Sequence, residues 1–109
     1  MTAETITATA TLRIEGEMDI YRAAELKNTL LAALDQTKQL ELDLASVSEL
    51  DTAGVQVLIM IKKQALANGR TLRLIAHSRA VIEVLKLFNL ITYFDDSPLI
   101  SASPATGRR

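Results

Sequence analysis

The side chains best suited to chemistry in this chain lie in residues 51–54, Asp-Thr-Ala-Gly, between two apolar runs. Asp51 and Thr52 both favour the N-cap of a helix, and apolar residues follow them at roughly helical spacing. A helix N-terminus carries unpaired N–H groups and about half a positive charge, so the fold would tolerate a phosphate on Thr52. Two roles for Thr52 follow: a plain helix cap, which is the commoner use of such a hydroxyl, or a phosphorylation site that acts as a switch.

The periodicity of apolar residues predicts strands and helices in alternation, within a single domain over residues 1–96. The predicted elements, in chain order, are a strand or hairpin at Thr5–Ile14, a helix from Tyr21 capped by Asp19, a strand at Leu40–Leu44, a helix at Thr52–Ala67, a strand at Thr71–Ala76, a helix after Ser78 and an edge strand at Ile91–Phe94. Gly16 is expected to end the first strand, and Asn68-Gly69 the second helix. Such alternation implies βαβ crossovers and an α/β fold with a largely parallel sheet. Residues 97–109 are predicted to form a mostly disordered tail.

The composition points to a soluble, cytoplasmic protein. The chain has 109 residues, no cysteine, and 12 basic residues against 13 acidic ones. Disulfides and thiolate zinc sites are therefore excluded, and a nucleic-acid partner is disfavoured because no extended basic surface is expected. The N-terminus lacks the pattern of a signal peptide, and no apolar run is long enough to insert into and span a membrane.

Residue types that would indicate catalysis are scarce. His77 is the only histidine, so a metal site would need several carboxylates around it, and a turn residue is the simpler interpretation. No Gly-x-Ser-x-Gly elbow and no glycine-rich phosphate loop occurs. The pair Lys62-Lys63 is interpreted as a solvated helix face. No enzyme activity, cofactor or metal is predicted.

Five short motifs occur in order along residues 12–94. They are Gly16-Glu17-Met18-Asp19, Asp43-Leu44, Asp51-Thr52-Ala53-Gly54-Val55-Gln56, Asn68-Gly69 and Leu87-Phe88-Asn89-Leu90. Each motif is weak alone, but in this order they resemble the STAS domain family, named for sulfate transporters and anti-sigma factor antagonists. The resemblance implies a mixed, mostly parallel sheet of four or five strands, with an antiparallel N-terminal strand and helices packed mainly on one face.

The same resemblance implies a functional surface. In the antagonists of that family the first hydroxyl after the aspartate is phosphorylated, and Thr52 is the matching residue. Ala53 replaces the family's second hydroxyl, which leaves one acceptor in this turn. The implied partner-binding residues are Glu17, Asp19, Asp51, Thr52, Ala53 and Gly54. From the residue types alone, Glu17 and Asp19 are equally consistent with turn and cap roles, and Asp51 with a charge that favours the helix N-terminus.

Three functional hypotheses follow. The first is a regulatory binding module similar to an anti-sigma factor antagonist, which binds an anti-sigma factor or a serine/threonine kinase and is released by phosphorylation of Thr52. The second is a STAS subunit of a lipid-trafficking ABC transporter, in which the threonine supports contact with the ATPase subunit. The third, a small α/β hydrolase, lacks a base for its nucleophile.

Overall fold

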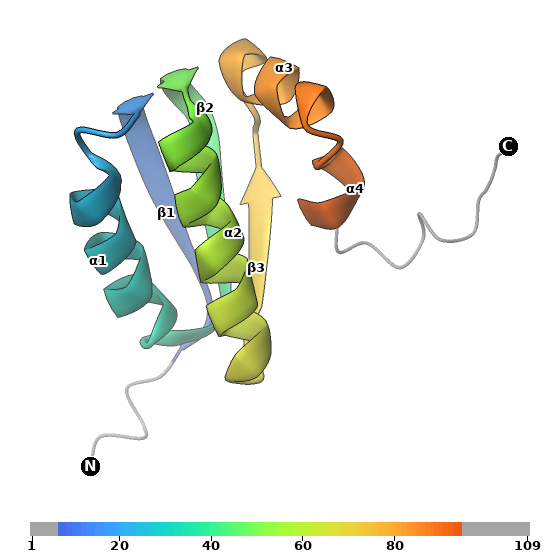
Figure 1. Cartoon of the computed structure of the whole chain (residues 1–109). Coiled ribbons are helices and arrows are strands. Elements are labelled where there is room, and N and C mark those ends of the chain that lie inside the picture. The colour runs from blue at the N-terminus through green and yellow to red at the C-terminus, as the bar shows by residue number, and fades with distance from the viewer. Residues whose placement is uncertain (1–6, 95–109) are drawn as a thin grey trace, which may run out of the picture.

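The computed structural model describes residues 7–94 and shows an α/β domain in which strands and helices alternate (Figure 1). Its elements are β1 (Thr7–Met18), α1 (Ala23–Leu34), β2 (Thr37–Leu50), α2 (Thr52–Ala67), β3 (Thr71–Ile75), α3 (Arg79–Leu87) and α4 (Ile91–Phe94). The three strands pair in parallel in the order β1-β2-β3. The predicted α/β class is confirmed, and the bounds predicted for the helix at α2 agree with the structure.

The sheet has fewer strands than expected. Within residues 7–94 there are three, where the resemblance implied four or five. From Thr7 onward β1 pairs in parallel with β2, so the described residues contain no antiparallel N-terminal strand. The start of the strand predicted at Thr5–Ile14, and the predicted tail at 97–109, lie outside the described residues.

The edge strand predicted at Ile91–Phe94 is wrong, because these residues form the short helix α4. Their β-branched and aromatic side chains favour strands. However, Asn89 adopts a left-handed conformation with φ 57°, which turns the chain just before them. Phe94 is buried in the core and its N–H donates to the Leu90 carbonyl at 3.1 Å. Tertiary packing therefore overrides the local propensity.

Both long strands extend further than predicted. Gly16 does not end β1 but lies inside it with φ 84°, where the pairing with β2 shifts register. A β-bulge of this kind absorbs the left-handed glycine and lets the strand continue to Met18. Strand β2 continues beyond its predicted end at Leu44. Its later residues Val47 and Leu50 are buried in the core, while the polar residues between them face solvent. The carboxyl ends of β1 and β2 thus reach the same edge of the sheet.

The core lies on one face of the sheet. Leu42 and Leu44 of β2 are fully buried there, as predicted, together with Leu58 of α2 and Leu85 of α3. Figure 1 shows α1 and α2 side by side over this face. The other face of the sheet is polar, and its centre is Glu41, which lies 3.8 Å from Nη1 of Arg73. The predicted arrangement with helices mainly on one face is confirmed.

The lysine pair on α2 departs from expectation at one position. Lys62 was predicted to be solvated, but only 6% of it is exposed and its Nζ lies 5.6 Å from the centre of the Tyr93 ring. That geometry suits a cation–π contact between α2 and α4. Lys63 is exposed, as expected.

Candidate functional site

The candidate site is the edge of the sheet where the first two strands end and two helices begin (Figure 1). Met18 and Leu50, the last residues of β1 and β2, are paired in register. Asp19 and Asp51 follow them directly, so the two predicted aspartates are brought to neighbouring positions. We call this edge, with Glu17, Asp19, Asp51 and Thr52, the rim.

Asp51 holds the rim together through three hydrogen bonds. Its Oδ1 accepts from the N–H of Gly54 at 3.0 Å, which makes Asp51 the N-cap of α2. Its Oδ2 accepts from the N–H of Ile20 at 3.1 Å, and its own N–H donates to the Met18 carbonyl at 3.1 Å. One carboxylate thus caps α2 and ties the β1–α1 turn to it. The interpretation of Asp51 as a charge at the helix N-terminus is confirmed in this more specific form.

Thr52 is the first residue of α2 and is exposed. Because Asp51 supplies the cap, the helix does not need the threonine hydroxyl, which makes no hydrogen bond to any residue of the 7–94 segment. The first turn of α2 contains no acidic side chain. A negative group on Thr52 would therefore meet the positive end of the helix, with unpaired N–H groups nearby.

Asp19 shapes the turn before α1 rather than capping the helix. Its Oδ1 accepts from the N–H groups of Tyr21 and Arg22 at 3.0 and 3.2 Å. The helix itself begins at Ala23, two residues later than predicted, and its N-cap residue Arg22 makes no side-chain cap. The prediction that Asp19 caps this helix is therefore wrong, because an Asx turn takes up the carboxylate first.

Arg22 is a positioning residue that the sequence analysis missed. Its Nη1 donates to the carbonyls of Glu15 and Glu17 at 2.8 and 2.7 Å. These two carbonyls flank Gly16, where the bulge disturbs the ladder between β1 and β2. The sequence did contain a signal for this role. Gly16 lies in a stretch where apolar and polar residues alternate, and an arginine follows it six residues later. Arg22 stabilises the end of β1 and hence the Glu17 side of the rim.

The rim is acidic and has apolar neighbours. Glu17 pairs in register with Glu49, both side chains are exposed, and Asp19 and Asp51 follow them. Ile20 and Tyr21, in the turn between β1 and α1, are 65% and 92% exposed. These two apolar side chains were also missed, although they stand outside the stripe of buried residues on α1. Exposed apolar side chains bordered by polar residues are a feature of many protein-binding surfaces.

Comparison with known proteins agrees with this geometry. Residues 1–99 match the family model described as "Mlab, STAS domain". The chain belongs to the STAS domain family.

Solved STAS structures share the fold. The unphosphorylated anti-sigma factor antagonist SpoIIAA is 18% identical, with a TM-score of 0.68 over 87% of this chain and 84% of that one. An anti-sigma factor antagonist from Mycobacterium paratuberculosis is 22% identical, with a TM-score of 0.71 over 86% and 80%. The phosphorylated form of the Bacillus cell fate determinant SpoIIAA is 18% identical, with a TM-score of 0.62 over 86% of each chain. These likenesses confirm the STAS fold.

In residues 7–94, no group of three or more His, Asp and Glu side chains is placed to hold a metal ion. Over the same residues, no helix has the length and apolar character needed to cross a membrane.

Gly54 lets α2 approach the end of β1. A Cβ at this position would overlap the Met18 carbonyl oxygen and lie 2.7 Å from Cδ1 of Leu50. Gly54 is itself buried. The missing side chain at Gly54 thus lets Thr52 of the rim lie close to the strand ends, while Ala53 is partly exposed.

We expect Gly54→Ala to lower the free energy of unfolding by about 1–3 kcal/mol. In most helices the same change is favourable by about 1 kcal/mol. Here the added methyl meets a backbone carbonyl, which cannot rotate away, so the clash outweighs the propensity gain. Urea denaturation measures the change. Ala53→Ser is the control, because it adds one heavy atom to the neighbouring side chain. A Gly54→Ala protein more stable than wild type would show that α2 does not contact Met18.

We expect His77 to make the stability of this STAS domain depend on pH. It lies between β3 and Ser78, whose Oγ caps α3 by accepting from the N–H of Val81 at 3.2 Å. Partial burial lowers the pKa of His77 below its ordinary value of 6.5. Well above pH 6.5 the histidine is neutral in both states, whereas around and below pH 6.5 the unfolded chain binds the proton more readily than the folded chain. Stability is therefore lost as the pH falls from 6.5 toward the folded pKa.

The measurement is the urea midpoint at about pH 7.5 and about pH 5.5, a window that largely avoids carboxylate titration. The wild type should lose more stability across the window than His77→Gln, whose amide does not titrate. Equal losses in the two proteins would assign the pH dependence to other groups.

Proposed function

We propose that this STAS domain is a regulatory, cytoplasmic protein-binding module of the anti-sigma factor antagonist kind, which binds an anti-sigma factor or a serine/threonine kinase and is released by phosphorylation of Thr52. One observation carries the proposal: the Thr52 hydroxyl is exposed at a helix N-terminus that Asp51 already caps. The hydroxyl is therefore available to a kinase without cost to the fold.

The proposed contact surface is the rim and its apolar neighbours. Glu17 and Asp19 supply negative charge, and Ile20 and Tyr21 supply exposed apolar area. A partner with a basic patch around an apolar centre complements this surface. Phosphorylation would add about two more negative charges at Thr52 to an edge that is already acidic. The likeness to SpoIIAA, solved in unphosphorylated and phosphorylated forms, supports this mode of regulation.

A second candidate uses the same surface differently. A STAS subunit of a lipid-trafficking ABC transporter would use the Thr52 hydroxyl for contact with the ATPase subunit. The observation that favours it is the residue pair at this turn, in which threonine stands where antagonists have serine and Ala53 offers no second acceptor. The two candidates predict opposite effects of Thr52→Ala.

The test is capture of the tagged full-length chain from a native lysate, followed by mass spectrometry of the peptide that contains Thr52. The antagonist proposal expects a stoichiometric partner on the unmodified chain, and the phosphorylated peptide only in the fraction without partner. Recovery of the phosphorylated peptide in the bound fraction would contradict release by phosphorylation. A transporter ATPase as the main captured protein would favour the second candidate.

A further inference from the structure

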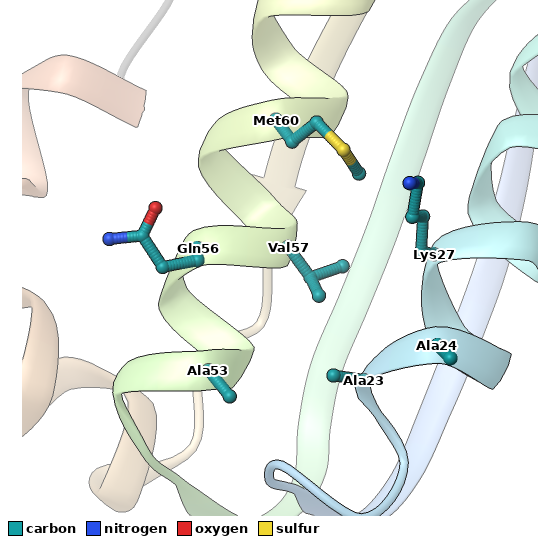
Figure 2. Close-up of a pocket in the computed structure, with 7 residues that line it drawn as sticks. All are labelled: Ala23, Ala24, Lys27, Ala53, Gln56, Val57 and Met60. Atoms are coloured by element: carbon teal, nitrogen blue, oxygen red, sulfur yellow. The ribbon is translucent and has the colours of Figure 1, made fainter.

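A groove runs between α1 and α2 on the helical face of the domain. It has a volume of about 420 Å³ and opens widely to solvent. Figure 2 shows Val57 and Met60 extending from α2 toward α1, with Ala23 and Lys27 facing them from α1. The groove exists because small residues stand where the helices face each other: Ala23 and Ala24 on α1, and Ala53 on α2.

The groove is continuous with the rim. Ala53, which lines it, is the residue after Thr52, and Ala23 follows directly on the turn that carries Ile20 and Tyr21. A partner that covers the rim can therefore extend into the groove without leaving the surface.

The charge of the groove indicates what fills it. Lys27 is the only charged residue in its lining, and no acidic residue lines it. Within residues 7–94, Lys27 makes no ion pair. An apolar channel with one unpaired cation at its side complements a ligand with an apolar stripe and one negative group.

We propose that this groove receives an amphipathic helix of the partner protein, whose apolar stripe lies over the alanines and Met60 and whose acidic side chain pairs with Lys27. The proposal rests on the proposed function and names the recognition element of that partner. An open channel between two neighbouring helices presents ridges that match a third helix, as in other helix-in-groove complexes. A free fatty acid has the same chemistry, but it favours an enclosed cavity in which its tail is sealed from water.

The test compares Ala24→Trp with Ala32→Trp in the full-length chain. Both alanines are exposed on α1, but only Ala24 lines the groove. Titrated against the protein that the wild type captures, Ala24→Trp should weaken binding about tenfold or more by filling the groove, and Ala32→Trp should bind like the wild type. Lys27→Glu should weaken binding similarly, with Lys38→Glu, at the start of β2, as its control.

A photoreactive residue at position 24 identifies the occupant directly. The cross-linked partner peptide should come from a helical segment with apolar residues three and four apart and an acidic residue among them. A cross-linked peptide that lacks an acidic residue would overturn the proposal.

The outcomes separate the groove from the proposed function. If Ala24→Trp binds as tightly as the wild type while Thr52→Glu does not bind, the groove proposal fails and the proposed function stands. If the wild type captures no protein, the proposed function fails, and the groove proposal fails with it. Saturable binding of decanoate, seen as amide shifts at Val57 and Met60 that Lys27→Glu abolishes, would replace the helix with a lipid ligand.

Discussion

Replacing Leu44 with alanine is expected to lower the free energy of unfolding by about 2–5 kcal/mol. Leu44 has 0% exposure and lies in β2, the middle strand of the sheet. Its carbonyl accepts from the N–H of Ser78 at 3.1 Å, so it also lies where the start of α3 joins the sheet. Removing its side chain leaves a cavity in the core, and such cavities are only partly filled by relaxation of the surrounding residues. For a domain of this size the loss is a large share of total stability.

The measurement is urea denaturation, with Leu66→Ala as the matched control. Leu66 belongs to α2 but is 64% exposed, so its truncation removes little buried surface. We expect the Leu44→Ala midpoint to fall well below both the wild type and the control, with a similar dependence on urea. Equal midpoints for the two variants would mean that β2 does not occupy the centre of the core.

Sequence reasoning predicted those elements whose signal is local. The start of α2 follows from a cap residue before an apolar periodicity, and its end from Asn68-Gly69, where Gly69 adopts φ 69°. The sequence does not decide which residue is the cap, because Asp51 and Thr52 are both good caps in isolation. Only the structure shows that Asp51 caps the helix and that the hydroxyl of Thr52 is not needed as a cap.

The failures have a different physical origin, since each depends on contacts distant in sequence. Gly16 is compatible with a strand only because β2 accepts a register shift and Arg22 supplies donors to the disturbed carbonyls. Lys62 is buried although it is charged, and the ring of Tyr93, 31 residues further along the chain, lies 5.6 Å from its Nζ. Residues 91–94 are helical despite their strand propensity, and this places Phe94 in the core. None of these contacts changes the spacing of apolar residues along the sequence, so periodicity does not predict them.

The groove was also invisible in the sequence. Alanines on α1 and at Ala53 count as ordinary helix formers, and a periodicity analysis gives them no role. They produce a groove only when two helices are placed side by side with small residues facing. For this reason a surface that serves binding is harder to predict than the core that supports it.

The variant Thr52→Glu is expected to keep the fold but to weaken partner binding about a hundredfold or more. Within the domain, the negative charge meets the positive end of α2, worth about 0.3–1 kcal/mol, while Asp51 repels it. These effects nearly cancel, so the circular dichroism spectrum and most of the thermal stability should be retained. At an interface the same charge must be desolvated against a surface that fits a neutral hydroxyl, and an unpaired buried charge costs about 3–5 kcal/mol.

Two further variants make this experiment decisive. Thr92→Glu places the same charge on an exposed threonine of α4, and should bind the partner like the wild type.

Thr52→Ala cannot be phosphorylated, and it tests what the hydroxyl itself contributes. If the antagonist proposal is right, Thr52→Ala stays bound under conditions that release the wild type, because no phosphate can form. If the chain is a transporter subunit that needs the hydroxyl, Thr52→Ala weakens the complex without any kinase. If both Thr52 variants bind the partner and release it like the wild type, Thr52 has no role beyond being the first residue of α2. The switch proposed at Thr52 would then be wrong.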